Sequence, residues 1–578
     1  MYDKFPFIAV GAEDECMLGW TTIAARIAAD AQRINAQFVC IETYPGADSA
    51  SILDHLSQSH VYGRVFHTLD LLKSPSDINE MLKQCLTDDP VFGQMNNVIM
   101  RDFIDPEKFA STQRELFSTD CLALIVGPGA SLITPTKRLI VYADMARWEL
   151  QMRQRRNLIG NLGADNLNER ASLKYKRAFF VDWRAADRLK QDLLDEIDFL
   201  LDTNAVDTPK LITGDAFRRG LALAARRPFR VVPFFDPGPW GGHWMERVCN
   251  LPTEDKPNHA WCFDCVPEEN SLLLGFGEQR VEIPAIDLVF QHPRELLGES
   301  IFTRFGAEFP IRFDFLDTMG GGNLSLQVHP LTPYIREHFG MNYTQDESYY
   351  MLDAEGDATV YLGLREGIDR DAMARDFESA QEGKIEFPAT KYVNQFSARK
   401  HDHFLIPAGT IHCSGRNSMV LEISATPYIF TFKLWDWGRL GLDGRPRPVH
   451  LKHGLANIQW DRTTKFVESS LINHFQPVAS GEGWREERTG LHELEFIETR
   501  RHWFTGKVEH NTQDTVHVLN LVEGTEAIVE SPTGAFDPFL VHYAETFIVP
   551  AAVGAYTVRP HGPSVGMECA TMLAFVRC

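Results

Sequence analysis

No stretch of this sequence is apolar enough, over enough residues, to cross a membrane. The 578 residues contain no run that approaches the 18 or so apolar positions of a membrane-spanning helix, and the first residues lack the charged and apolar regions of a secretion signal. No basic block appears either, and the net charge is -22. Because a nucleic-acid surface needs clustered Lys and Arg, we expect neither a nucleic-acid partner nor a membrane partner, and a soluble, cytoplasmic protein.

Cysteine is also sparse, at ten residues, and a chain of this size does not need disulfides to form a core. The most closely spaced pair is Cys262 and Cys265, and no second pair lies nearby to complete a zinc site. We therefore expect reduced thiols in the core. With 44% hydrophobic and 24% charged residues, the composition is that of a globular protein, and the length suits roughly three or four domains.

The N-terminal part of the chain alternates short apolar runs with amphipathic stretches. The apolar runs, typical of strands in a buried parallel sheet, occupy residues 7–10, 38–41, 122–126 and 139–142. Apolar residues spaced by three and four, the helical pattern, lie between them at residues 23–34 and beyond them at 146–159. This alternation predicts an α/β domain over residues 1–226.

Residues 141–156 and 175–183 resemble a uridine or nucleoside kinase of the P-loop class, in which an arginine-rich helix would close over transferred phosphate. A working phosphate loop needs Gly-x-x-x-x-Gly-Lys-Ser/Thr, because its amides and its Lys hold the phosphates. The chain has Gly11 and Gly19 at too long a spacing, with Trp20 where Lys belongs. We expect a degenerate, non-catalytic domain rather than an active kinase. Residues 127–131 are a second candidate loop, or a plain turn.

Polar and apolar side chains alternate in the segment 324–329. On a strand, Gln327 and His329 share one face while the leucines and the valine share the other. Glu347 precedes another strand-like run, and His412 follows the turn at residues 407–410. Either histidine alone is an ordinary residue at a strand end. Together the four side chains form a mixed nitrogen and oxygen set that suits Zn2+ and leaves a position open for water or substrate.

These residues resemble the type I phosphomannose isomerases, which are metal-dependent cupins. The resemblance rests on the QVHP and IPAGTIH motifs with the acidic residue between them, and it runs from about residue 234 to 455. Flanking matches are PWGG at 239–242, HPRELLG at 292–298 and LWDWGR at 434–439. The resemblance implies mannose 6-phosphate and fructose 6-phosphate as the default substrates, and one Zn2+ per chain held by Gln327, His329, Glu347 and His412.

Aldose and ketose interconvert through a cis-enediol, which needs a Lewis acid and a group that moves a proton between two carbons. We expect Arg439 to stabilise the enediolate or to bind phosphate, with Asp436 orienting it; a salt bridge at the rim is the alternative. Two lysines of the family are replaced here by Asp314 and Gln345, and Gln cannot act as a base. The sequence thus predicts catalytic roles for Arg439, Asp436, Lys433 and Arg312, substrate binding by Arg336 and Gln345, and His338 as a further substitute.

Residues after about 486 repeat the strand, turn and Pro-Ala rhythm of the first barrel. Ala555 stands at the place of His412, so this copy resembles a cupin that has lost its metal. We predict a kinase-like α/β domain at 1–226, a metal-binding catalytic cupin with helical insertions at 227–466, and a second cupin-like jelly roll without metal ligands at 467–578. A metal-dependent sugar or sugar-phosphate isomerase is the leading hypothesis. A non-catalytic sugar-binding or regulatory cupin, or a bifunctional protein with a working kinase, are the alternatives.

Overall fold

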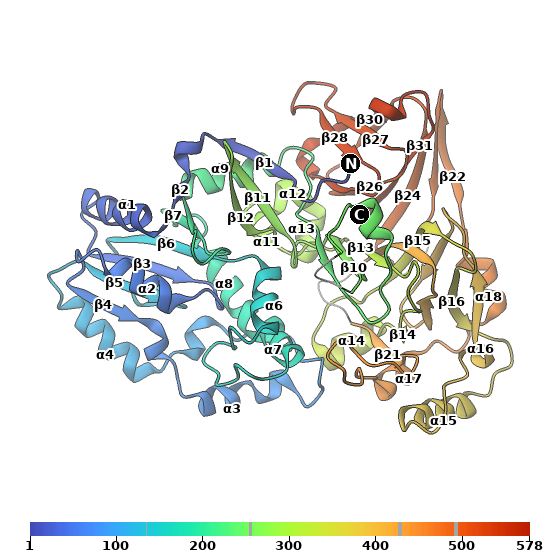
Figure 1. Cartoon of the computed structure of the whole chain (residues 1–578), viewed down its shortest axis with the longest axis horizontal. Coiled ribbons are helices and arrows are strands. Elements are labelled where there is room, and N and C mark those ends of the chain that lie inside the picture. The colour runs from blue at the N-terminus through green and yellow to red at the C-terminus, as the bar shows by residue number, and fades with distance from the viewer. Residues whose placement is uncertain (135, 254–256, 426–429, 491–494, 578) are drawn as a thin grey trace. The chain divides into compact units, whose positions relative to one another are not determined.

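The computed structural model describes residues 1–134, 136–253, 257–425, 430–490 and 495–577 (Figure 1). Contacts divide the chain into two compact units. One unit comprises Phe7–Ala224 and Ser271–Gln291, and the other comprises Met1–Pro6, Ala225–Asn270 and His292–Cys578. Within the described part of the chain, each helix is too short or too polar to traverse a bilayer.

The first unit contains a seven-stranded sheet in the order β2-β8-β7-β6-β3-β5-β4. Its five strands from β7 to β4 are parallel, whereas β8 and β2 are antiparallel additions at one edge. The strands are β2 (Met17–Leu18), β3 (Phe38–Thr43), β4 (Arg64–His67), β5 (Ala123–Gly127), β6 (Arg138–Asp144), β7 (Phe199–Asp202) and β8 (Lys210–Thr213). The predicted parallel strands at 38–41, 122–126 and 139–142 thus lie side by side.

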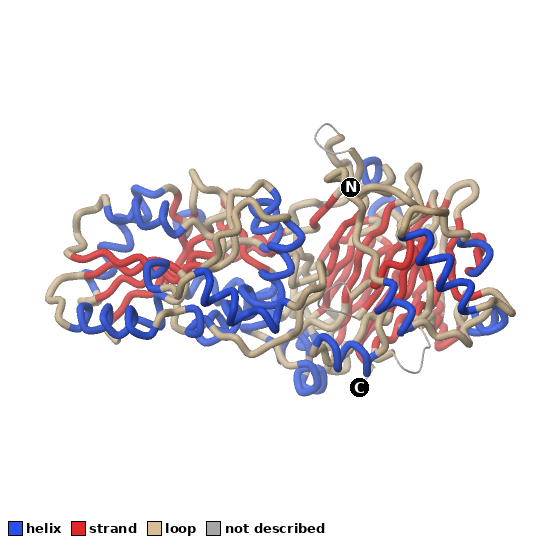
Figure 2. Tube along the Cα trace, turned by 90° about the horizontal axis from the view of Figure 1, so that it is seen from below, coloured by secondary structure: helices blue, strands red, loops and turns tan. Residues whose placement is uncertain are grey.

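Helices cover both faces of this sheet (Figure 2). On one face, α1 (Trp20–Arg33) and α2 (Ser49–Ser57) pack their apolar stripes against β3, β5, β6 and β7. Ile23 and Ile27 of α1 are fully buried there, four residues apart as the helical period requires. The remaining helices include α3 (Pro75–Leu86), α4 (Pro106–Phe117), α5 (Ala130–Ile133), α6 (Arg147–Arg155), α7 (Ala171–Arg177), α8 (Trp183–Leu193) and α9 (Gly214–Ala224).

The predicted strand at residues 7–10 is not part of the seven-stranded sheet. It forms β1 (Phe7–Gly11), which pairs in parallel with β11 (Ser271–Phe276) in a separate three-stranded sheet completed by β12 (Gln279–Pro284). The helix that follows, α11 (Ile286–Gln291), brings Asp287 to the buried Lys190 ammonium of α8, which also binds Asp144. Pairing with β1 and the Lys190–Asp287 ion pair both join Ser271–Gln291 to the α/β unit.

The second unit contains two barrels, each made of two antiparallel sheets. In the first barrel one sheet has the order β18-β15-β20-β13-β10-β9, and the other has the order β17-β16-β19-β14-β21. Their strands are β9 (Phe234–Asp236), β10 (Trp261–Cys265), β13 (Arg312–Asp317), β14 (Leu326–Val328), β15 (Glu347–Ala354), β16 (Thr359–Leu364), β17 (Val393–Ser397), β18 (His403–Ile406), β19 (His412–Ser414), β20 (Ser418–Ser424) and β21 (Phe432–Trp435). The predicted helical insertions are α14 (Thr332–Phe339) and α15 (Arg370–Gln381).

The second barrel repeats this plan with the sheets β22-β23-β24-β31-β26-β29 and β25-β30-β27-β28. An apolar core that includes Phe504, Leu519 and Phe547 fills the space between them. The strands are β22 (Gln476–Gly481), β23 (Trp484–Arg488), β24 (Ile497–Phe504), β25 (Val508–Asn511), β26 (His517–Glu523), β27 (Glu526–Glu530), β28 (Phe539–His542), β29 (Thr546–Val549), β30 (Ala555–Pro560) and β31 (Cys569–Val576).

Candidate metal centre

Three short strands of the first barrel bring the predicted ligands together. Gln327 lies in the middle of β14, directly opposite His412, the first residue of β19. His329 follows β14 two positions after Gln327, and Glu347 is the first residue of β15. All four side chains are buried, so the alternation in the sequence places polar groups inside the barrel rather than on its surface.

Glu347 joins the two histidines. Its Oε1 lies 2.8 Å from His412 Nε2, and its Oε2 lies 3.1 Å from His329 Nε2. The amide nitrogen of Gln327 is 3.3 Å from the same His412 Nε2. Among the described residues, this His–Glu–His group is the set whose potential ligand atoms all lie within 4.8 Å of one another.

The hydrogen bonds of the two imidazoles leave the correct nitrogens for a metal. His329 Nδ1 lies 2.9 Å from the carbonyl oxygen of Phe430, and His412 Nδ1 lies 2.9 Å from that of Thr410. Because a carbonyl only accepts, each Nδ1 carries the proton and each Nε2 keeps a lone pair. His329 Nε2 and Glu347 Oε1 are buried and make no hydrogen bond of ordinary geometry, although each lies within 3.1 Å of an atom across the cluster. Buried ligand atoms in this arrangement fit a divalent cation with carbonyl-oriented histidine ligands.

Charge is concentrated at this point of the barrel. Burial opposes ionisation of Glu347, but the two imidazoles outweigh burial and lower the pKa of this carboxyl below its ordinary value. Burial lowers the pKa of His329, yet Glu347 more than compensates and raises it overall. A metal ion at this place would therefore compete with a proton for His329.

A second layer of polar residues surrounds the cluster. Gln345 Nε2 donates to Glu347 Oε2 at 3.0 Å and to Glu422 Oε1 at 3.3 Å, so Gln345 bridges two carboxyl groups. Glu422, on β20, lies opposite Asp314 of β13. Burial and the nearby Glu347 raise the pKa of Glu422 well above its ordinary value. Sequence analysis missed Glu422, although a lone acid in the apolar segment 418–424 was a usable signal.

Arg312 is tied to Asp314 on the same strand. Its Nε donates to Asp314 Oδ2 at 2.5 Å, and both side chains are buried. Burial raises the pKa of Asp314 to about 6 in spite of this ion pair. Asp314 is thus paired with the arginine two residues before it.

Lys433 lies directly opposite Gln327 across β14 and β21. Opposed residues of an antiparallel pair share one face, so the Lys433 side chain leaves its strand on the same side as Gln327. Burial lowers the pKa of Lys433 to about 7, and the neighbouring Arg447 acts in the same direction. The amine is therefore available in its neutral form near physiological pH.

Arg439 and Asp436 form a fixed pair at the end of β21. Arg439 donates from Nε at 3.0 Å and from Nη2 at 2.7 Å to Asp436 Oδ1, and from Nη1 to the carbonyl of Asn323. Asp436 also accepts from Ser325 at 2.8 Å and from Arg447 at 3.0 Å. Asp436 therefore holds the Arg439 guanidinium within a larger network of hydrogen bonds.

Two predicted substrate-side residues are placed less directly. Arg336 is exposed on α14 and donates to the carbonyl of Asn342 at 3.3 Å. His338 stacks on Tyr334, with ring centroids 3.9 Å apart. None of the contacts described for Arg336 joins it to the His–Glu–His cluster.

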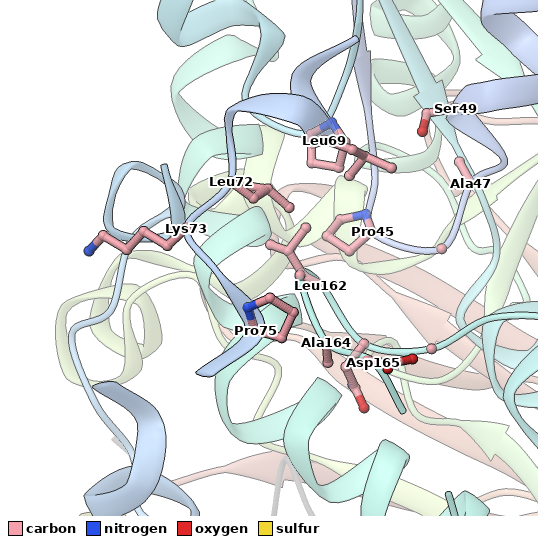
Figure 3. A pocket seen from close by; sticks show the side chains of 15 residues that line it. Pro45, Ala47, Ser49, Leu69, Leu72, Lys73, Pro75, Leu162, Ala164 and Asp165 are labelled. Carbon is pink, nitrogen blue, oxygen red and sulfur yellow. The ribbon is translucent and has the colours of Figure 1, made fainter. Parts of the chain in front are cut away.

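The α/β unit has a cavity of its own, of about 430 Å3. It lies at the carboxyl ends of the parallel strands, between the loops that follow β3, β4 and β5, where open α/β sheets bind ligands. Figure 3 shows Pro45, Leu72 and Leu162 facing one another across it, while Lys73 extends away from them. The cavity is lined mainly by apolar groups, and Ser49 is the hydroxyl among the described residues that line it.

Of the two candidate phosphate loops, one does not follow the central strand, and the amides of the other already bind a side chain of the protein. Gly19 precedes α1 after the edge strand β2, not after the central strand β3. At residues 127–131, the backbone amides of Gly129 and Ser131 bind the Glu42 carboxyl group at 2.6 and 2.8 Å. The protein's own acid thus occupies this nest of amides.

Comparisons with known proteins treat the two parts of the chain differently. A family model described as a domain of unknown function, DUF8485, matches residues 19–226. Mannose-6-phosphate isomerase ManA of Bacillus subtilis is 23% identical over 254 residues, which are 43% of this chain and 72% of that protein. The mannose-6-phosphate isomerase of Streptococcus mutans is 25% identical over 218 residues, 37% of this chain and 63% of that protein.

Solved structures give matches to the same group of proteins. The mannose 6-phosphate isomerase from Bacillus subtilis, 18% identical, covers 60% of this chain and 99% of its own, with a TM-score of 0.48. A phosphomannose isomerase from Salmonella typhimurium, 13% identical, covers 61% and 100%, with a TM-score of 0.47. By sequence, part of this chain is therefore similar to mannose-6-phosphate isomerases.

Proposed function

We propose that the first barrel is a metal-dependent aldose–ketose isomerase of sugar phosphates, with mannose 6-phosphate and fructose 6-phosphate as its substrates. The observation that carries the proposal is the buried His329–Glu347–His412 cluster, whose ligand atoms converge next to the strand that carries Lys433, a lysine of lowered pKa. Homology to mannose-6-phosphate isomerases supports the same conclusion. Zn2+ is the proposed metal because the ligand set is nitrogen and oxygen in equal parts.

The residues divide the chemistry between them. When bound to His329, Glu347, His412 and Gln327, the metal would supply Lewis-acid stabilisation of developing negative charge on the sugar oxygens. Lys433 takes the proton from one carbon and returns it to its neighbour, because its amine is neutral near pH 7. Arg439, held by Asp436, stabilises the enediolate or binds the phosphate.

Arg312 and Gln345 receive supporting roles in this proposal. Arg312 keeps the buried Asp314 paired, and Gln345 fixes the orientation of Glu347 from outside the ligand set. Arg336 is exposed, so we assign it to binding the phosphate of the substrate.

A sugar-binding or regulatory barrel without turnover is the second candidate. The replacement of both family lysines by Asp314 and Gln345 favours it, because neither side chain can supply the lost amine. The two candidates differ in one measurement, the isomerisation of mannose 6-phosphate by metal-loaded protein. Turnover supports the enzyme, and tight sugar binding without turnover supports the alternative.

For the α/β unit we propose a degenerate kinase-like domain that binds a small ligand without phosphoryl transfer. The cavity at the carboxyl ends of β3, β4 and β5 supports ligand binding. The loop after the central strand β3 carries Asp48, whose carboxyl caps α2 by accepting from Ser51, where a phosphate loop would offer Lys. A working kinase, the remaining hypothesis, would show itself by ATP-dependent phosphorylation of a nucleoside or sugar.

A further inference from the structure

Three histidines lie together inside the second barrel. His502 of β24 and His510 of β25 approach with ring centroids 4.6 Å apart, and His510 stacks on Tyr556 of β30 at 4.9 Å. Tyr556 in turn lies 5.9 Å from the ring of His517, at the start of β26. For comparison, the rings of His329 and His412 in the first barrel are 5.0 Å apart.

The strand register shows that this histidine cluster occupies the same place in its barrel as the metal centre does in the first. Glu347, the first residue of β15, pairs with Ile406, just before the turn of residues 407–410. His517, the first residue of β26, pairs with Val549, just before the corresponding Pro-Ala turn. His517 is therefore the counterpart of Glu347.

The second pair of strands agrees. Gln327 of β14 pairs with His412 of β19, and His510 of β25 pairs with Tyr556 of β30. The sequence comparison placed Ala555 opposite His412, but Ala555 is exposed and Tyr556 is the buried residue that faces the cluster. The register thus corrects that alignment by one residue.

The ring nitrogens of the cluster are partly free to bind. His502 Nδ1 and His510 Nε2 are buried without a hydrogen-bond partner. The other nitrogen of His502 faces Glu486 Oε1 at 3.4 Å, and His517 Nδ1 is 2.8 Å from the hydroxyl of Tyr556. A metal-binding histidine ordinarily has its second nitrogen fixed in this way by a carboxylate or another polar group.

We propose that the second barrel binds a divalent transition-metal ion, with His502 and His510 as its first ligands and His517 as the third. Three imidazoles suit Zn2+, Co2+, Ni2+ or Cu2+ and exclude Ca2+ and Mg2+, which prefer oxygen.

The geometry also defines what binding requires. Within the described chain, the ligand atoms of these histidines do not converge to within 4.8 Å, as those of the first barrel do. Metal binding would therefore require these side chains to move closer together. Arg500 lies beside Glu486 at 2.7 Å, so Glu486 is already paired and serves to orient His502. We therefore expect weaker binding than in the first barrel.

The test is titration of metal-stripped, full-length protein with Co2+ alone, followed by visible absorption and equilibrium dialysis. The parent should bind two equivalents. The double variant His502→Gln/His510→Gln should bind one equivalent, that of the first barrel. The double variant His329→Gln/His412→Gln should keep the equivalent of the second barrel. The exposed control His60→Gln should bind two equivalents. A parent that binds one equivalent, or a His502/His510 variant that still binds two, would overturn the proposal.

A milder variant keeps the test decisive if the double variant does not fold. Tyr556→Phe removes only the hydroxyl that orients His517, so it should weaken the second equivalent about 10–100-fold and leave the first unchanged. Unchanged affinity for both equivalents would contradict the site. The His329/His412 variant tests the metal site of the first barrel, and hence the proposed isomerase. The His502/His510 and Tyr556 variants test the second barrel, so either proposal can fail without the other.

Discussion

Lys433 and Gln327 face each other across the antiparallel strands β14 and β21, and this pairing puts a lysine of lowered pKa beside a candidate metal ligand. Asp314 of β13 and Gln345 are not amines, and an amide such as that of Gln345 cannot act as the base. Lys433 nevertheless places an amine on β21, next to the strand that carries Gln327. This position predicts that Lys433 moves the proton between the two carbons.

Lys433→Met should abolish most of the isomerisation while the protein keeps its metal. General acid–base groups contribute about 100-fold to 10,000-fold, so turnover should fall by that range. The measurement is kcat for mannose 6-phosphate together with bound metal, with the exposed Lys384→Met as the matched control. A Lys433→Met protein that turns over normally would remove Lys433 from the mechanism.

The pH profile tests the same residue independently. The pKa of Lys433 lies near 7, below its ordinary value, so the amine is protonated at lower pH and gains base function as pH rises through about 7. We expect kcat/KM to increase with pH along a limb centred there, and the limb to vanish in Lys433→Met. A profile without such a limb in the parent protein would argue against an amine as the base.

Arg439→Ala should reduce turnover about 100-fold to 1,000-fold, the range typical of electrostatic stabilisers, and leave bound metal unchanged. Arg439→Lys should rescue little, because an ammonium cannot make the paired hydrogen bonds that the guanidinium makes to Asp436. Isomerisation assays of both variants, with the exposed Arg445→Ala as control, measure this. Full activity in Arg439→Ala would assign the Arg439–Asp436 pair to structure alone.

Metal affinity should fall as the pH is lowered, starting above the ordinary pKa of histidine. The reason is that Glu347 raises the pKa of His329 in spite of burial, so protons compete with the metal at higher pH than usual. Dissociation constants for Zn2+ measured from about pH 8 to about pH 5.5 would show this. Affinity that stays constant over this range would contradict a site with two histidine ligands.

The α/β unit should not transfer phosphate. Asp48 at the start of α2 repels a phosphate group, and Glu42 occupies the amides of Gly129 and Ser131. With ATP and a panel of nucleosides and sugars, we expect turnover far below the roughly 1–100 per second of kinases. Phosphorylation at a kinase-like rate would show that the cavity beside Pro45 and Ser49 is an active site.

Much of the site could be predicted from local sequence patterns. The alternation at residues 324–329 predicts that Gln327 and His329 share one face, and the Pro-Ala turn predicts that His412 begins a strand. Glu422 was missed because its role depends on pairing with Asp314, a strand more than a hundred residues away. The strand β1 was predicted, but its sheet was not, because its partner β11 lies some 260 residues further along the chain. Such long-range register leaves no local periodicity to detect.

The histidine cluster of the second barrel shows the same limit. Aligning Ala555 with His412 by motif suggested an empty copy, whereas the register of β25 with β30 turns Tyr556 toward His510. A shift of one residue on a strand exchanges the inner and outer faces, so the content of a barrel is decided by pairing rather than by motif.

The central claim is that the first barrel isomerises a sugar phosphate with a metal held by His329, Glu347 and His412. The most direct test measures conversion of mannose 6-phosphate to fructose 6-phosphate by full-length protein, first stripped of metal and then reloaded with Zn2+, beside His412→Gln treated identically. We predict turnover that is lost on stripping, restored by Zn2+ in the parent, and absent in His412→Gln at equal Zn2+. Turnover by stripped protein, or no turnover by Zn2+-loaded parent, would contradict the account.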